Sequence, residues 1–316
     1  MRRSASRPRS AASGASVNTA IATTAIADAP YLGRFAPSPT GPLHLGSLVA
    51  ALGSYLDARH CGGRWLVRME DLDREREVPG CADQMLRTLE AHGLTWDGAV
   101  EYQSRRVPYY TKALARLARR GLTFECSCTR RELSGDGGYP GTCRSGPQRA
   151  GPTATRFRVD DGTIEFEDRA QGRCVFDLRE RGDVVVRRRD GVFAYQLAVV
   201  VDDARQAVTD VVRGADLLDN TPWQIALQRA LGLPTPRYCH LPLIVEQQGG
   251  KLSKSRRSLP LDPAEAAGQL YQSLTLLRQA PPLKLELEPP PVILAWATAH
   301  WSVEAFRGVK EVLLPQ

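Results

Sequence analysis

The amino-acid sequence predicts an α/β fold: a parallel sheet with helices on both faces, an inserted segment and a short helical C-terminal region. Three observations lead to this prediction. Strand-like and helix-like segments alternate along residues 30–122, the alternation stops from 123 to 190, and it resumes from 191 to 256. Residues 257–316 read as mostly helical between proline clusters. We therefore expect one sheet-based domain in two halves, divided by an inserted subdomain.

The first half begins with a short apolar strand that ends at Pro37, because proline cannot continue a ladder of backbone hydrogen bonds. Apolar residues then recur at helical spacing behind a loop rich in proline and glycine. Gly93 and Gly121 mark the ends of two later helices. In chain order, the expected elements are a strand at 31–36, a loop at 37–47, a helix at 48–56, a strand at 65–70 and helices at 81–92 and 107–120.

The later elements follow from the same patterns. Within the insertion, Asp190-Gly191 is a hairpin-turn signal between apolar runs at 184–188 and 192–201. The α/β pattern then resumes. The expected elements are strands at 156–159, 184–188, 208–213 and 238–245, and a helix at 217–231.

The composition bounds the class of protein. The chain has 316 residues, of which 42% are apolar and 24% charged, as in ordinary globular proteins. No run of 18 apolar residues occurs, which excludes a transmembrane helix, and we expect no membrane partner. The net charge of +7 permits a polyanionic partner without proving one. We expect residues 1–29, rich in Arg, Ser and Ala, to form a disordered extension; an organelle transit peptide of the same composition is the alternative.

The cysteines point to a metal site. There are seven, an odd number spread along the chain, which argues against a disulfide scaffold and for a reducing compartment. Cys126, Cys128 and Cys143 fall within 18 residues, and three thiolates so close favour zinc, which takes four ligands in structural sites. The insertion contains no histidine to complete the set. Three ordinary free cysteines are the alternative.

The loop at 37–47, with the sequence PSPTGPLHLGS, suits a nucleotide. Its glycines and prolines shape a turn whose backbone N–H groups can point outward, and the helix behind it offers its N-terminus to an anion. His44 is placed to donate a hydrogen bond to a phosphate, and Gly46 leaves room for a flat ring against the backbone. A plain turn that caps a helix is the alternative.

A second loop contains two of the few lysines. Only five of the 42 basic residues are lysines, yet Lys251 and Lys254 both fall in the segment KLSKS behind two glycines. In a chain that otherwise uses arginine, this choice favours compact ammonium groups that contact a polyphosphate. A solvated basic loop is the alternative.

Together the two loops resemble the HIGH and KMSKS signatures of class I aminoacyl-tRNA synthetases, here HLGS and KLSKS. Five further segments resemble the glutamyl-tRNA synthetase group of that class: RFAPSPTG at 34–41, RMEDLD at 68–73, DD at 202–203, VRGADLL at 212–218 and TP at 221–222. The resemblance covers residues 31–256 and implies the Rossmann-like parallel sheet of class I synthetases. Met69 departs from the group's usual pattern R-I-E-D-x-D. Ser47 departs from the HIGH form of the class, at a position where this group tolerates small residues.

The resemblance implies that the chain activates L-glutamate with ATP, accompanied by Mg²⁺, and that His44, Lys251 and Lys254 are catalytic. A fixed guanidinium suits the side-chain carboxylate of glutamate, and a carboxylate suits its ammonium group. The implied ATP-binding residues are Pro37, Gly41, His44, Gly46, Ser47 and Lys254. The implied glutamate-binding residues are Arg34, Phe35, Ala36, Pro37, Ser38, Glu70, Tyr195 and Arg213.

Only 61 residues follow Ser255 in this sequence, too few for the helical anticodon-binding region of a full glutamyl-tRNA synthetase. In this the chain resembles the short paralogues of that enzyme. They activate glutamate without tRNA and transfer it to the queuosine base in the anticodon loop of tRNA(Asp). Their inserted segment holds one structural zinc ion, with a tyrosine as the fourth ligand. The resemblance assigns Cys126, Cys128, Tyr139 and Cys143 to that site.

Three other interpretations stay open. The chain could be a minimal glutamyl-tRNA synthetase that charges a tRNA 3′ end, or a non-catalytic RNA-binding paralogue, although a binding protein has no use for His44, Lys254 and a glutamate site. A generic nucleotidyltransferase with a HIGH loop would not require Arg34, Glu70 and Arg213 together. The family and the reduced cysteines lead us to expect a monomer in the bacterial cytoplasm.

Overall fold

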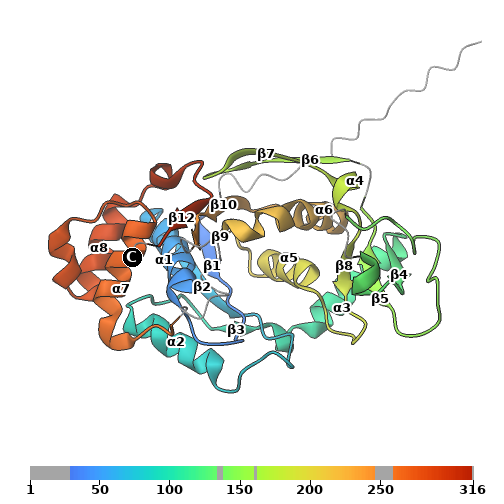
Figure 1. The fold of residues 1–316 in the computed structure, drawn as a ribbon, viewed down its shortest axis with the longest axis horizontal. Coiled ribbons are helices and arrows are strands. Elements are labelled where there is room, and N and C mark those ends of the chain that lie inside the picture. The colour runs from blue at the N-terminus through green and yellow to red at the C-terminus, as the bar shows by residue number, and fades with distance from the viewer. Residues whose placement is uncertain (1–28, 134–137, 160–161, 246–258, 315–316) are drawn as a thin grey trace, which may run out of the picture.

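The computed structural model describes residues 29–133, 138–159, 162–245 and 259–314. Strands β1 (Leu32–Phe35), β2 (Arg64–Met69) and β3 (Glu101–Tyr102) pair in parallel. A second sheet runs in the order β7 (Gly172–Asp177), β6 (Thr163–Asp168), β10 (Arg237–Leu241) and β9 (Asp210–Gly214). The backbone N–H of Thr209 donates to the carbonyl of Leu32 over 2.9 Å, so β1 and β9 lie side by side at the centre of the molecule (Figure 1).

Helices pack on both faces of these strands. Neighbouring residues of β9 show this directly, because Val211 and Val212 point to opposite faces and belong to two different hydrophobic cores. The helices are α1 (Leu45–His60), α2 (Cys81–Ala91), α3 (Val107–Arg119), α4 (Leu178–Arg181), α5 (Tyr195–Arg205), α6 (Thr221–Leu231), α7 (Ala266–Leu276) and α8 (Pro290–His300). The predicted α/β fold with a parallel sheet is confirmed.

The inserted segment lies at one end of the molecule, on the right of Figure 1. Strands β4 (Thr123–Cys126), β5 (Ala154–Phe157) and β8 (Val184–Arg187) form an antiparallel sheet there. The hairpin of β6 and β7 instead extends the central sheet, since β6 pairs in parallel with β10. The range 123–190, predicted as one subdomain, therefore encloses strands of two sheets.

The structure corrects three predicted elements. The run at 192–201 was expected as the second strand of a hairpin, but it enters helix α5 at Tyr195 after a single bridge between Arg187 and Phe193. A run with few polar residues can be a buried helix as well as a buried strand, and α5 is buried from Gln196 to Asp203. The strand at 238–245 is divided at Pro242 into β10 and β11 (Leu243–Val245). The helix at 217–231 begins as a 3₁₀ turn, and α6 starts only at Thr221.

The C-terminal region packs against α1, at the left of Figure 1. Buried residues of α7 and α8, Leu270, Leu274 and Ile293, share one core with Leu48 and Leu52 of α1. A last strand, β12 (Glu311–Leu313), pairs in parallel with β11, which sequence analysis did not anticipate. Among the described helices, none has the length and apolar character that crossing a bilayer requires.

A buried carboxylate connects the C-terminal region to the central strands. Asp57 of α1 accepts hydrogen bonds from the hydroxyl of Tyr31, from both terminal nitrogens of Arg169 and, over 2.9 Å, from the indole N–H of Trp301. Asp57 is only 1% exposed. Four separate parts of the chain therefore meet at one side chain.

Candidate functional site

A cavity of about 900 Å³ opens at the carboxyl ends of the parallel strands, where ligands bind in open α/β sheets. It is lined by the ends of β1, β2 and β9, by the loop that leads to α1, and by the N-terminus of α5. Every predicted ATP- or glutamate-binding residue that the structure describes lines this cavity: Arg34, Phe35, Ala36, Pro37, Ser38, Gly41, His44, Gly46, Ser47, Glu70, Tyr195 and Arg213. Lys251 and Lys254 lie outside the described residues.

His44 caps the N-terminus of α1. Its ring Nδ1 accepts a hydrogen bond from the backbone N–H of Ser47 over 3.4 Å, and the Ser47 hydroxyl lies 2.7 Å from the backbone nitrogen of His44. Burial lowers the pKa of His44, so the ring is neutral near pH 7. A neutral imidazole that accepts at Nδ1 carries its proton at Nε2. The cap thus leaves Nε2–H as a donor, the group that a phosphate oxygen requires.

Gly46 makes room for the His44 ring. A Cβ atom at position 46 would lie 3.1 Å from Cε1 and 3.2 Å from Nδ1 of His44, closer than side chains normally approach. Sequence analysis explained this glycine by the space that a flat ligand ring needs. The structure adds a second reason, because a side chain at position 46 would require the imidazole to shift by a few tenths of an ångström.

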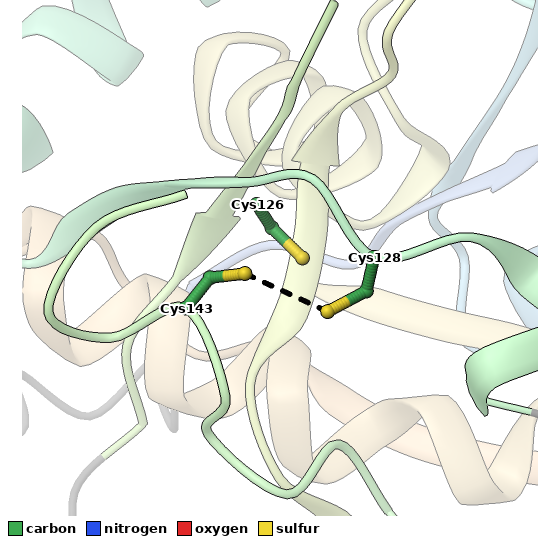
Figure 2. Close-up of side chains that lie close together, drawn as sticks. All are labelled: Cys126, Cys128 and Cys143. Atoms are coloured by element: carbon green, nitrogen blue, oxygen red, sulfur yellow. Dashed lines mark hydrogen bonds between the residues drawn. The ribbon is translucent and has the colours of Figure 1, made fainter. Parts of the chain in front are cut away.

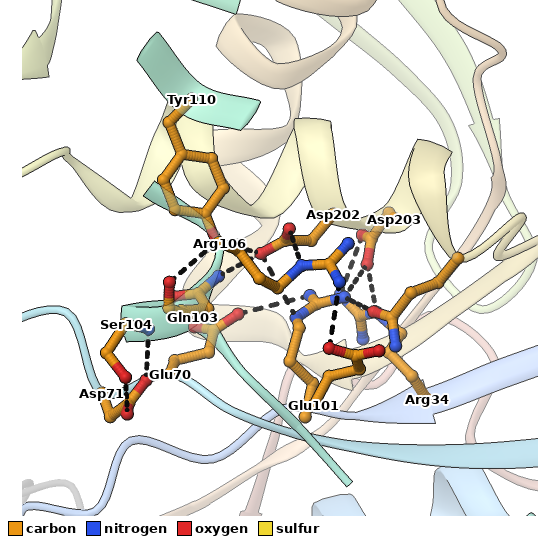
Figure 3. A network of polar contacts seen from close by, with 12 residues as sticks. Arg34, Glu70, Asp71, Glu101, Gln103, Ser104, Arg106, Tyr110, Asp202 and Asp203 are labelled. Carbon is orange, nitrogen blue, oxygen red and sulfur yellow. Dashed lines mark hydrogen bonds and ion pairs between the residues drawn. The ribbon is translucent and has the colours of Figure 1, made fainter. Parts of the chain in front are cut away.

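Arg34 is fixed by a buried carboxylate (Figure 3). Its Nε lies 3.2 Å and its Nη2 3.4 Å from the two oxygens of Asp203, and Arg34 is 3% exposed. Arg68, fully buried behind it, donates to Asp203 over 2.8 Å. Burial acts to raise the pKa of Asp203, but the two guanidinium groups outweigh burial and lower it. Asp203 is therefore ionised, and Arg34 faces the cavity in one orientation.

Glu70 is an acidic residue that lines the cavity at the end of β2. Its backbone N–H donates to the carbonyl of Pro37 over 2.9 Å, which fixes the end of β2 beside the loop. Its carboxylate accepts from Arg68 over 3.3 Å, and the side chain is 9% exposed. Burial raises the pKa of Glu70 to about 7, despite the nearby Arg68 and Arg34. A cationic ligand therefore strongly stabilises the ionised form of this desolvated carboxyl group.

Arg213 of β9 and Tyr195 of α5 form another part of the cavity wall. Nη1 of Arg213 donates to the Tyr195 hydroxyl over 3.0 Å, and Nη2 donates to the hydroxyl of Thr221 over 2.8 Å. Because the Tyr195 oxygen accepts a hydrogen bond from Arg213, the O–H of Tyr195 points away from Arg213 and is left to donate to another group. The cavity therefore presents guanidinium groups at Arg34 and Arg213 and a carboxylate at Glu70, which together can hold a zwitterion with an additional carboxylate.

The three cysteines of the inserted segment converge (Figure 2). Their sulfur atoms all lie within 4.8 Å of one another, with Cys128 and Cys143 at 3.5 Å. The Tyr139 hydroxyl lies 3.5 Å from the sulfur of Cys126 and 4.0 Å from that of Cys128. Sulfur ligands of a tetrahedral zinc ion are about 3.8 Å apart, given Zn–S bonds of about 2.3 Å. The donor set and its spacing are suited to a metal ion.

Comparison with known proteins decides the family. The catalytic-domain profile described as tRNA synthetases class I (E and Q) matches residues 32–137 and 140–279. A glutamyl-Q tRNA(Asp) synthetase of Pseudomonas aeruginosa is 55% identical over 288 residues, which are 90% of this chain and 98% of that protein. A second, of Dechloromonas aromatica, is 52% identical over 91% of this chain and 99% of that protein. The chain belongs to the glutamyl-Q tRNA(Asp) synthetase family.

A solved structure agrees with this family. The glutamate tRNA ligase of Elizabethkingia meningosepticum, crystallised in complex with its amino acid, matches with a TM-score of 0.74 at 25% sequence identity. The match covers 89% of this chain and 66% of that one. The family is one of ATP-using ligases, so the chain is an enzyme of the aminoacyl-tRNA synthetase type.

Sequence analysis missed the residues behind the cavity wall. Asp202 and Asp203 matched a family segment but received no role, although two carboxylates after a run of buried valines signal a buried ionic contact. Arg68 was quoted only as part of its segment, yet it joins Asp203 to Glu70. His240, one of five histidines, carried no signal beyond its place in an apolar strand.

Proposed function

We propose that this enzyme activates L-glutamate with ATP, without tRNA, and transfers the glutamyl group to the queuosine base in the anticodon loop of tRNA(Asp). The observation that carries the proposal is that all the described candidate ATP- and glutamate-binding residues line one cavity, among them the guanidinium groups of Arg34 and Arg213 and the carboxylate of Glu70. The names of the relatives support the substrate and the acceptor.

In the first step, the α-carboxylate of glutamate attacks the α-phosphate of ATP, and glutamyl-adenylate and pyrophosphate form. Negative charge builds on the phosphoryl oxygens, so catalysis depends on positioning and electrostatics. His44 Nε2–H, at the N-terminus of α1, donates to the α-phosphate. Lys251 and Lys254 stabilise the leaving pyrophosphate, and Mg²⁺ accompanies the nucleotide as part of the substrate.

Glutamate is bound through its ammonium group and its side-chain carboxylate. Glu70 accepts hydrogen bonds from the ammonium group. These bonds replace the hydration that the carboxylate loses on burial. Arg213 and Tyr195 bind the side-chain carboxylate, while Arg34 and Ser38 lie on the β1 side of the same cavity. The backbone around Phe35 and Ala36 forms the wall between them.

In the second step, a hydroxyl of the queuosine cyclopentenediol attacks the activated carbonyl, an ester forms, and AMP leaves. The acceptor must reach the cavity with its ribose-phosphate backbone outside. Arg76 and Arg188 line the cavity, and the exposed side chain of Arg76 is available at the surface to a phosphate.

One zinc ion bound by Cys126, Cys128, Tyr139 and Cys143 would stabilise the inserted segment. Arg156 holds the tyrosine ring in place, because its guanidinium lies 3.9 Å from the centre of the Tyr139 ring. We take the enzyme to act as a monomer in the bacterial cytoplasm, where thiols stay reduced.

The test uses radiolabelled glutamate, ATP and two pools of bulk tRNA, one with queuosine and one from cells unable to make it. We expect label only on the queuosine-containing pool. Equal labelling of both pools would instead mean that the enzyme charges an ordinary tRNA 3′ end. Glutamate-dependent ATP–pyrophosphate exchange without tRNA checks the activation step, and its absence would favour a non-catalytic RNA-binding protein.

A further inference from the structure

Behind Arg213 lies a buried polar pair that does not line the cavity. His240 of β10 and Asp168 of β6 are 0% and 1% exposed. Nδ1 of His240 lies 2.6 Å from Oδ2 of Asp168, and Nε2 of His240 lies 3.0 Å from Nε of Arg213. Burying a carboxylate and an imidazole is costly unless their hydrogen bonds are complete. The pair connects the core of the sheet to a residue of the cavity wall.

The hydrogen bonds determine which ring nitrogen carries the proton. Oδ1 of Asp168 accepts from three backbone N–H groups, those of Ala170, Gln171 and His240, over 2.9–3.1 Å. These bonds and His240 outweigh burial and lower the pKa of Asp168, so it is an ionised acceptor. Burial lowers the pKa of His240 to about 4, so its ring is neutral. Nδ1 must then carry the proton, and Nε2 accepts from Arg213.

The guanidinium of Arg213 is thereby held on three sides. Its Nε donates to His240, its Nη2 to Thr221 and to the carbonyl of Leu217, and its Nη1 to Tyr195. Nη1 carries a second N–H, for which the described residues provide no hydrogen-bond partner. This N–H and the O–H of Tyr195 are the two donors that remain for a ligand in the cavity.

We propose that Asp168 and His240 are positioning residues that orient Arg213 so that Nη1–H and the Tyr195 hydroxyl receive the side-chain carboxylate of the amino-acid substrate. The proposal rests on the proposed function, which supplies glutamate as that substrate. It also explains specificity. Both oxygens of a carboxylate accept, whereas the NH₂ of glutamine would face a donor, and a buried unpaired donor is costly.

The test is Asp168→Asn. Asparagine has the same shape and keeps an oxygen for the three backbone N–H groups, but its NH₂ donates to Nδ1 of His240. The ring must then carry its proton at Nε2, where it opposes the N–H of Arg213. We expect the KM for glutamate in ATP–pyrophosphate exchange to rise about tenfold, as for a lost charged hydrogen bond, with the KM for ATP unchanged within about twofold. Discrimination against glutamine should fall.

The matched control is Asp210→Asn, which alters another buried carboxylate of the same sheet. Asp210 contacts Arg237 and Thr209 and does not touch Arg213. We expect this variant to lose stability with little change in either KM. Equal increases in the KM for glutamate in both variants, or a joint rise in both KM values for Asp168→Asn, would overturn the proposal.

A double-variant experiment separates orientation from packing. Glutamine at position 240 can offer an amide oxygen to Arg213 whatever residue stands at 168. We therefore expect Asp168→Asn to change the KM for glutamate less than about twofold in the His240→Gln background. The same factor in both backgrounds would show a packing effect alone and would contradict the proposed role.

A spectroscopic measurement needs no activity. In the full chain labelled with ¹⁵N-histidine, the His240 resonances, assigned by loss in His240→Gln, should report a proton at Nδ1 in the parent and at Nε2 in Asp168→Asn. An unchanged tautomer would refute the mechanism. If the parent shows no glutamate-dependent exchange while the tautomer changes as expected, the proposed function fails and the orientation of Arg213 stands.

Discussion

The buried carboxyl group of Glu70 is suited to bind a cation, and the same burial lowers the stability of the folded protein at neutral pH. Its carboxyl group is buried beside Arg68 and its pKa is raised to about 7, against 4.5 for the free group. The folded protein therefore holds a proton at Glu70 that the unfolded chain has lost between these pH values. By linkage, this group contributes stability that is present below pH 4.5 and is lost as the pH rises through about 7.

We predict that Glu70→Gln removes this pH dependence. Relative to the variant, the parent should lose on the order of 2–3 kcal/mol of unfolding free energy between pH 4.5 and 8. Chemical denaturation at several pH values measures this difference. At pH 8 the variant should also lose glutamate-dependent exchange, because it no longer presents a charge to the ammonium group. Parallel pH profiles for parent and variant would show that burial does not raise this pKa.

At the scale of the element, the N-terminus of α1 and the imidazole of His44 that caps it depend on each other. Position 46 is the second residue of this helix, and an added Cβ there would push the His44 ring by a few tenths of an ångström. A change there should affect chemistry more than folding, since alanine is itself a good helix former.

We predict that Gly46→Ala lowers the rate of adenylate formation about tenfold, because the shifted imidazole meets the phosphate in poorer geometry. Its control is Gly268→Ala in α7, where an added Cβ would meet no atom within 4 Å. The control should gain about 0.5–1 kcal/mol of stability and keep full activity. Pre-steady-state adenylate formation and thermal unfolding test both variants, and full activity in Gly46→Ala would refute the role of the His44 ring.

The inserted sheet carries its own prediction. Chelation, or Cys143→Ser, should release the bound metal ion and lower the melting temperature by several degrees, since a structural zinc site contributes directly to folding. Cys61→Ser, at an exposed cysteine, is the control and should change neither property. Elemental analysis beside thermal unfolding gives both readings. A metal-free parent protein with an unchanged melting temperature would leave the three thiols as ordinary cysteines.

At the scale of the whole molecule, Asp57 joins the first strand, α1, the β6–β7 hairpin and the C-terminal helices. We predict that Asp57→Asn destabilises the protein by about 2–3 kcal/mol, because Arg169 loses the charge of a buried partner. Solvent limits this loss, since Arg169 itself is part exposed. Tyr31→Phe, which removes one hydrogen bond, should cost about 1 kcal/mol. Denaturant unfolding measures both, and one transition shared by fluorescence and circular dichroism would show that the C-terminal region unfolds with the rest.

The sequence was informative where chemistry restricts local residue choice. The glycine and proline loop, the acidic end of β2 and the cysteine spacing each depend on neighbours in the chain, so these parts of the candidate sites could be predicted from the residues. Tyr195 and Arg213 were assigned only through the resemblance to a known family. Long-range pairing could not. The contact between Asp168 and His240 spans 72 positions, and the pairing of β11 with β12 depends on how distant strands pack. Helix α5 was misassigned because a helix buried on all sides lacks an amphipathic period.

The pairing of β12 with β11 has a practical consequence for experiments on this enzyme. β11 ends at Val245, whose carbonyl accepts from the backbone N–H of Leu314, and the next residues lead toward the lysine-bearing segment KLSKS. Any peptide fused after Gln316 would therefore start three residues after β12, the strand that pairs with β11. Affinity tags, fluorophores and surface linkers should be attached at the N-terminal end, so that kinetic measurements report the enzyme rather than the attachment.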